Sequence, residues 1–217
     1  AGNVADTEVM NDGTTGYGSV PYNYRIGKYE VTNGQYREFL NATTRYGDPY
    51  GLYHSGDIPG VPNRSGIERR GLGTDEDPLE YFPKDNDPEW DNRPVNYVSW
   101  YDTLRFANWL HNGQPTGAQG PGTTEDGAYD MSLGSSVVRK PGAQVFVASE
   151  DEWYQAAYYK GGGTNAGYWD YPTQSYTAPT AEAPAGTDLI NGSANYYFGG
   201  YVDSTYYTTE VGAYTTK

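Results

Sequence analysis

The sequence predicts an α+β domain in which three short helices and a few strands are set among long ordered loops. Three segments combine a helix-capping residue with apolar residues at helical spacing, and two short segments alternate as strands do. Most of the remaining chain is rich in Gly, Pro, Asp and Asn without a sustained period. A length of 217 residues is sufficient for one core, so we expect a single domain over residues 1–217.

The first helix is predicted to follow Thr32, in VTNGQYREFLNA. Thr32 and Gln35, three residues later, form a capping box, in which each side chain accepts a hydrogen bond from the other residue's backbone amide. Tyr36, Phe39 and Leu40 fall on one face of this helix. We therefore expect these three side chains in the core.

The second helix is predicted in VSWYDTLRFANWLHNG. Ser99 and Asp102 provide its start signal, and Asn112 with Gly113 provides its stop signal. The stripe expected to face the core consists of Trp100, Leu104, Ala107 and Leu110.

The third helix is predicted in VASEDEWYQAAYYKGGG, where Ser149 and Glu152 form another capping box. Gly161 to Gly163 are expected to end it, and Trp153, Ala156 and Ala157 are expected to face inward. All three helices are short, so tertiary packing must hold them.

Strands are predicted at residues 24–31 and 143–148, where the residues alternate or are strongly β-forming. Residues 44–94 and 112–142 read as long loops, and residues 177–186 as an extended Pro/Ala connector.

The composition excludes several classes of function. The chain has 28 acidic and 14 basic residues, a net charge of -14 and a pI near 4.4, so it repels nucleic acids and anionic lipid surfaces. It contains no Cys, which excludes thiol nucleophiles, disulfides and thiolate metal sites within it. We expect no membrane span, and the 24 Tyr and 29 Gly favour an extracellular, secreted protein whose signal peptide is already removed.

Two segments are candidates for a hard-cation site. KDNDPEWDNRP, residues 84–94, has acidic side chains at alternating positions, but it lacks the glycine and terminal glutamate of an EF-hand, and a solvated charge run is the favoured interpretation. In SANYYFGGYVDSTYYTTEV, Asn195 and Asp203 bracket a Gly-Gly turn, and on spacing alone a surface hairpin is favoured. The acidic residues of the first segment are Asp85, Asp87, Glu89 and Asp91.

No residue is identified as catalytic. His54 and His111 are the available imidazole bases, and neither lies in a nucleophile motif. The glycines of YKGGGTN follow a helix rather than a strand, so they do not form a phosphate loop. The 24 tyrosines suit sugar binding or protein contacts, and they suit loop anchoring equally well, so both interpretations stay open.

Three of these segments, in this order, resemble the signature segments of the formylglycine-generating enzyme (sulfatase-modifying factor) domain family, a variant of the C-type-lectin-like fold. They are IGKYEVTNGQYREFLNA, RPVNYVSWYDTLRFANWLHNG and ASEDEWYQAAYYKGGG, and the resemblance covers most of residues 24–214. It is strongest to the secreted, Tyr- and Gly-rich bacterial branch. The resemblance implies that the third helix packs on an irregular core through Trp153 and holds loops in place.

The resemblance also implies a calcium site. In the family, Ca²⁺ is bound by an Asn, the next carbonyl, a later Asp and a carbonyl two residues beyond it. On this chain these ligands correspond to Asn195, Tyr196, Asp203 and Thr205.

The departures from the family bear on activity. The family's C-terminal half, which carries the catalytic cysteines, has no recognisable counterpart before Lys217, so we expect this half to be lacking and expect no copper site in this chain. One hypothesis is a non-catalytic extracellular module that presents Tyr-rich loops to a glycan, a protein partner or copies of itself, including a surface filament formed by strand donation. The alternative is the N-terminal part of a sulfatase-modifying oxidase whose cysteines lie outside this chain. The first is favoured because the chain has no Cys.

Overall fold

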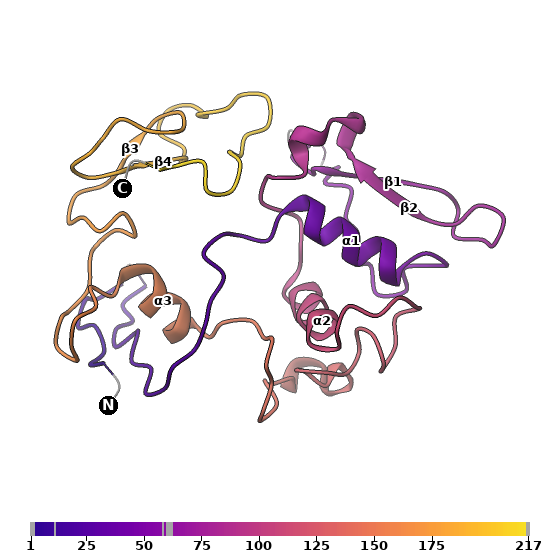
Figure 1. The fold of residues 1–217 in the computed structure, drawn as a ribbon, viewed down its shortest axis with the longest axis horizontal. Helices are drawn as coiled ribbons and strands as arrows, with labels where there is room; N and C mark the ends of the chain where they lie inside the picture. Colours follow the sequence, from indigo (N-terminus) through magenta and orange to yellow (C-terminus); the bar gives the residue numbers. More distant parts are fainter. Residues whose placement is uncertain (1–2, 11, 58, 60–62, 216–217) are drawn as a thin grey trace. The chain divides into compact units, whose positions relative to one another are not determined.

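Short helices and two small sheets joined by long loops make up the protein, as expected for an α+β, loop-rich fold (Figure 1). The structure is a computed structural model that describes residues 3–10, 12–57, 59 and 63–215. The chain forms two compact units, residues 30–147 and residues 1–29 with 148–217. The C-type-lectin-like arrangement and the single domain stay predictions.

The elements are α1 (Asn33–Thr43), β1 (Ile67–Arg70), β2 (Glu80–Pro83), α2 (Trp100–His111), α3 (Glu150–Tyr158), β3 (Thr180–Ala181) and β4 (Ser193–Ala194), with 3₁₀ turns at Lys84–Asn86, Pro88–Trp90 and Met131–Ser136.

Helix α1 begins at the predicted capping box. The Thr32 side chain accepts from the Gln35 amide at 3.2 Å, and the Gln35 side chain accepts from the Thr32 amide at 3.1 Å. Tyr36, Phe39 and Leu40 are buried, as the helical spacing predicts.

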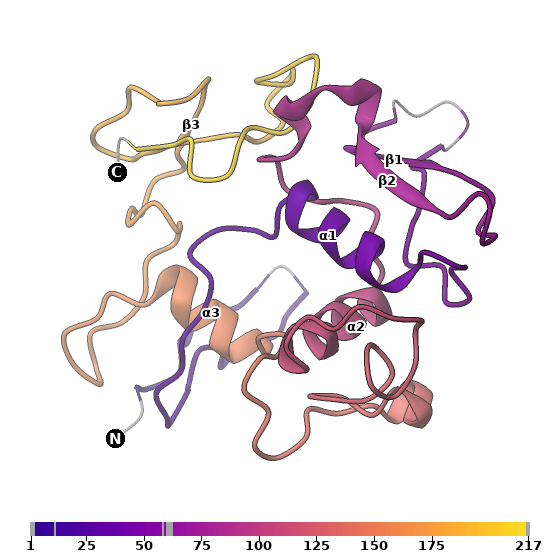
Figure 2. The same cartoon turned by 45° about the vertical axis from the view of Figure 1, so that its right-hand side comes forward.

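The core of the unit formed by residues 30–147 is centred on Phe39. Its ring centroid lies 5.3 to 5.4 Å from those of Tyr36, Phe106 and Trp109. Such tilted and edge-to-face pairs add about 0.5–1.5 kcal/mol each beyond the area they bury. Helix α1 lies along the antiparallel β1–β2 hairpin, which adds Ile67 and Tyr81 to the cluster (Figures 1 and 2).

Helix α2 is capped by Ser99, which forms the predicted capping box with Asp102. Leu104 and Ala107 are buried as expected, but the expectation that Trp100 faces the core is wrong, because its side chain is 59% exposed. Trp100 is the first residue of the helix, and Trp109 at the other end provides the indole of the core.

Helix α3 starts at Ser149 with the predicted box to Glu152, but its buried face differs from the prediction. Trp153 is 53% exposed, Ala156 is also exposed, and Tyr154 is buried instead. The Tyr154 ring packs against three other tyrosine rings and its hydroxyl donates to the Asp6 carboxylate at 2.7 Å, which explains why this side chain points inward. The helix ends at Tyr158, before the three glycines, and the ring partners of Tyr154 are Tyr17, Tyr158 and Tyr168.

The strands predicted at residues 24–31 and 143–148 do not form. A strand needs a ladder of partners, and the second segment meets single contacts only, such as the Val147 amide donating to the Tyr129 hydroxyl. Strands β1 and β2 lie in the region expected to be loop, and β3, in the expected connector, pairs in parallel with β4. No helix within the described residues has the length and apolar character needed to cross a bilayer.

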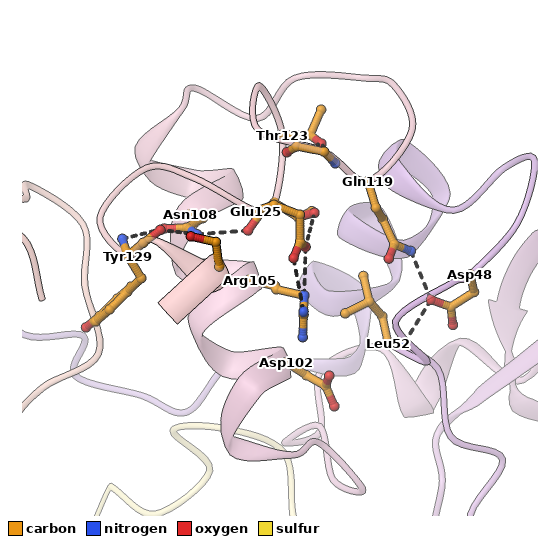
Figure 3. A network of polar contacts seen from close by, with 12 residues as sticks. Asp48, Leu52, Asp102, Arg105, Asn108, Gln119, Thr123, Glu125 and Tyr129 are labelled. Atoms are coloured by element: carbon orange, nitrogen blue, oxygen red, sulfur yellow. Dashed lines mark hydrogen bonds and ion pairs between the residues drawn. The ribbon is translucent and has the colours of Figure 1, made fainter. Parts of the chain in front are cut away.

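The fully buried side chain of Asn108 connects α2 to the loop that follows it (Figure 3). Its Nδ2 donates to the carbonyl oxygens of Thr124 at 2.8 Å and Tyr129 at 2.9 Å, and its Oδ1 accepts from the Tyr129 amide at 2.8 Å. One side chain therefore satisfies three backbone groups of an irregular loop.

We expect Asn108→Ala to lower the free energy of unfolding by about 3 kcal/mol, because it leaves buried backbone groups without partners and removes packed atoms. Urea denaturation followed by circular dichroism measures this change. The control is Tyr101→Ala on the same helix, where the side chain is 40% exposed and a shift within about 0.5 kcal/mol is expected. Equal shifts in the two variants would contradict the role assigned to Asn108.

Candidate functional site

An open pocket of about 570 Å³ lies in the unit formed by residues 1–29 and 148–217. Its wall is formed by the segment 20–24, the second half of α3 and the loop that follows this helix. The lining is rich in hydroxyl, amide and aromatic groups, which hydrogen-bond and stack. The polar and aromatic lining residues are Asn3, Tyr22, Asn23, Tyr24, Gln155, Tyr159 and Thr164.

The capping glutamate of α3 holds one wall of this pocket. Glu152 is fully buried, and its carboxylate accepts from the Ser149 amide at 2.7 Å and from the Tyr22 hydroxyl at 2.7 Å. The Tyr24 hydroxyl donates to the carbonyl oxygen of the same residue. The capping box that starts α3 therefore also positions two tyrosines of the pocket.

The floor of the pocket is tied together by Asn3. Its Nδ2 donates to the Gly18 carbonyl oxygen and the Tyr168 hydroxyl, and its Oδ1 accepts from the Val20 amide and from Gln155. Gly18 has φ of +86°, and a Cβ at this position would lie 2.7 Å from the Tyr168 hydroxyl oxygen, so the close approach requires glycine.

The described side chains that line the pocket are uncharged, and the Glu152 carboxylate lies next to them. Among the described residues that line it, none is Lys, Arg or His. Burial, followed by the neighbouring Glu152 carboxylate and Tyr22, raises the pKa of Tyr24, so this hydroxyl keeps its proton at neutral pH. The described lining thus supplies hydrogen-bonding and stacking surfaces and contains no residue that serves as a general acid or base near neutral pH.

Each of the two histidines accepts a hydrogen bond from a backbone amide. His54 Nδ1 accepts from the Gly56 amide at 3.0 Å, and its ring stacks on Tyr97 with centroids 5.8 Å apart. His111 is the last residue of α2, as the sequence predicts, and its Nδ1 accepts from the Gln144 amide. The His54 ring thus fixes a local turn, and the His111 ring connects the end of α2 to a loop 33 residues later.

In the unit formed by residues 30–147, a second polar network cross-links loops to α2 (Figure 3). Arg105 pairs with both carboxylate oxygens of Glu125 at 2.7 and 3.0 Å. Asp48 accepts from the Leu52 amide and from Gln119 Nε2, each at 2.9 Å. These side chains form hydrogen bonds with one another and with the backbone, so the network stabilises loops for which the sequence predicts no partner.

The acidic segment 84–94 forms turns and an ion pair. The Asp87 carboxylate accepts from the Glu89 amide at 3.0 Å, and Asp91 pairs with both Nε and a terminal nitrogen of Arg37. These contacts support the interpretation of a charge run with local caps. Across the described residues, no group of three or more His, Asp or Glu side chains could hold a metal ion.

Asn195 and Asp203 lie in one loop and are connected through Tyr207. Asn195 Nδ2 donates to the Tyr207 carbonyl oxygen at 3.3 Å, and the Tyr207 amide donates to the Asp203 carbonyl oxygen at 3.0 Å. One carboxylate oxygen of Asp203 accepts from the amides of Thr205 and Tyr206 at 2.9 Å. Amide, carboxylate and carbonyl oxygens are the types that Ca²⁺ takes, so these residues are chemically suited to it, and the four-residue site stays a prediction.

Two carboxylates that sequence reasoning missed organise the segment 180–193. Glu182 accepts from the amides of Thr187 and Asp188 and from two hydroxyls, and the hydroxyl of Ser193 contributes most to lowering the pKa of Glu182 to about 2. Asp188 accepts from the amides of Asn191 and Ile190, which lower its pKa to about 2. An Asx turn is the sequence signal for the contacts of Asp188, whereas the contacts of Glu182 join residues five or more positions apart and have no such signal.

Comparison with known proteins connects this chain to one family. The family model described as the sulfatase-modifying factor enzyme 1-like domain matches residues 12–216. A formylglycine-generating enzyme of Thermomonospora curvata is 28% identical to the chain over 107 residues, which cover 44% of this chain and 35% of that protein. The match therefore spans about a third of the length of that relative. No solved structure matches the chain.

The segment 180–193 is expected to lose order in acid. The pKa values of Glu182 and Asp188 are lower in the folded protein than in the unfolded chain, so their contribution is complete above the ordinary carboxyl values and is lost as pH falls toward about 2. NMR shifts of the Thr187 and Asn191 amides between about pH 5 and pH 2 measure this transition.

The variant Glu182→Gln should disorder the same amides already at neutral pH, because the neutral amide accepts fewer and weaker bonds. The matched control is Glu210→Gln, at an exposed position, which should leave them unchanged. If the amide NMR shifts of the wild type changed with a midpoint near the ordinary glutamate pKa of about 4.3, the assignment would be contradicted.

Proposed function

The chain belongs to the sulfatase-modifying factor enzyme 1-like domain family, and on that premise we propose that it is a non-catalytic binding module that takes a carbohydrate in its tyrosine-lined pocket. The observation that carries the proposal is the pocket itself, in which three tyrosines, two asparagines and a glutamine surround about 570 Å³. Fold membership alone does not establish an activity, so the proposal rests on these groups.

Tyrosine suits sugar recognition for two physical reasons. Its ring packs against the apolar face of a pyranose, and its hydroxyl exchanges hydrogen bonds with ring substituents. Its side chain has only two torsions, so ordering it on binding costs little entropy. Tyr22 and Tyr24 are already held by Glu152, which reduces that cost further.

The proposal places the protein outside the cell, in agreement with its tyrosine- and glycine-rich composition. The proposal also includes binding of a protein partner, or self-association that could extend to a surface filament, at the loop that carries Tyr197 and Phe198. These side chains are 66% and 80% exposed, and exposed aromatic groups are frequent at protein contacts.

The alternative function is the N-terminal part of an oxidase that modifies sulfatases. It is supported by the similarity to a protein named formylglycine-generating enzyme. The 217 residues contain no Cys, so thiol chemistry would have to come from residues outside them. Conversion of a sulfatase cysteine by the protein in its natural full-length form would favour this alternative.

We expect an oligosaccharide to bind in the pocket and Tyr22→Ala to weaken this binding at least tenfold, about 1.4 kcal/mol, through loss of the ring and hydroxyl. Calorimetric titration with glucose, glucosamine and N-acetylglucosamine oligomers tests the binding. Tyr22→Phe separates the ring from the hydroxyl, and Tyr46→Ala, at a tyrosine that is 61% exposed in the other unit, is the matched control. Absence of binding by all three oligomers would refute the proposal.

We further propose that Ca²⁺ binds Asn195, Asp203 and the carbonyl oxygens of Tyr196 and Thr205. Binding to the folded state alone raises the melting temperature, so added Ca²⁺ should raise it in the wild type. Asp203→Ala should abolish this increase, whereas Asp170→Ala, at an exposed aspartate of the same unit, should retain it. An unchanged calcium response in Asp203→Ala would rule out this site.

A further inference from the structure

The three tyrosine hydroxyls of the pocket all donate their hydrogen to the protein itself. Tyr22 donates to the Glu152 carboxylate, Tyr24 to the Glu152 carbonyl oxygen, and Tyr159 to the Gly163 carbonyl oxygen. These partners only accept hydrogen bonds, so the direction of each bond is determined. Each hydroxyl oxygen therefore meets a ligand as an acceptor.

The amides below these tyrosines follow the same pattern. Gln155 lines the pocket and donates one hydrogen of Nε2 to Asn3, so its second N–H and its Oε1 can both meet a ligand. Both polar atoms of Asn3 are engaged within the protein. The amide of Asn23 and the hydroxyl of Thr164 add groups that both donate and accept. The three tyrosine hydroxyls of the lining thus act as acceptors only, whereas its amides and Thr164 act as both donors and acceptors.

The charge distribution acts in the same direction. The Glu152 carboxylate lies 2.7 Å behind the Tyr22 hydroxyl, no described lining residue is basic, and the chain carries a net charge of -14. The faces of the tyrosine rings carry the negative side of the aromatic quadrupole, which attracts cations. A ligand with a positive charge and several donors complements all of these features.

From this pattern, and on the basis of the proposed carbohydrate function, we infer that the pocket selects amino sugars whose amine is free and protonated. An ammonium group supplies three donors, which match the three tyrosine hydroxyl oxygens that can only accept. The N-acetylated form of the same sugar is neutral and keeps one N–H donor, so it loses both the charge attraction and two hydrogen bonds to the tyrosine oxygens. A protonated amine on a polyol is therefore preferred over both the acetylated sugar and the neutral hexose.

The test compares glucosamine and N-acetylglucosamine oligomers of equal length by calorimetric titration. The glucosamine oligomer should bind at least about tenfold more tightly, and its advantage should disappear at a pH where its amine is neutral. A matched pair of variants locates the effect. Asn23→Lys adds a positive charge at the exposed rim of the pocket, and Asn92→Lys adds the same charge at an exposed site in the other unit.

Asn23→Lys should remove the preference for the free amine, whereas Asn92→Lys should retain it. Equal affinity for the two oligomers would overturn this inference and leave the proposed function standing. A similar loss in both variants would overturn it as well, because the attraction would then come from the overall charge. Tighter binding of a lysine-rich peptide at the same pocket would overturn the assignment to a sugar, and failure of every oligomer to bind would refute the proposed function together with this inference.

Discussion

The structure depends on hydrogen bonds between buried side chains and the backbone of irregular loops. Backbone amides and carbonyls that are removed from water must find partners, and the short two-stranded sheets provide few of them. Asn108 satisfies three backbone groups of one loop, and Asp48 and Glu152 each accept from backbone amides elsewhere. Because each of these side chains joins a loop to a helix or turn, the polar contacts define the fold as much as the apolar core does.

The helix starts could be predicted from the sequence because a capping box is local. Its two residues are three positions apart, so Thr32, Ser99 and Ser149 identified the three helices without knowledge of the fold. The buried faces of short helices are harder to predict, because a face is defined by what covers it. Trp100 and Trp153 have the helical spacing of core residues and are exposed, whereas Trp109 and Tyr154 on the same helices are buried by contacts with residues far apart in the chain.

The candidate site was predictable only in its chemical character. The abundance of tyrosine suited a binding surface and loop anchoring equally well, and the location of the pocket depends on contacts between residues far apart in the chain, such as Tyr22 with Glu152, 130 positions later. The contacts of Glu182 were not predictable because the Pro/Ala composition of residues 177–186 favours an extended connector without partners. The two strand predictions were wrong for a related reason. Alternation of residues shows a tendency to form a strand, but it does not identify the strand's partner.

The double role of Glu152 has a consequence for how this protein can change over evolution. The same carboxylate starts α3 and orients Tyr22, so a substitution there alters the stability of the helix and the shape of the pocket together. Exposed rim positions such as Asn23 carry no such double role in the contacts described. A substitution at such a position can therefore alter the ligand preference while Tyr22, Tyr24 and the cap of α3 stay in place.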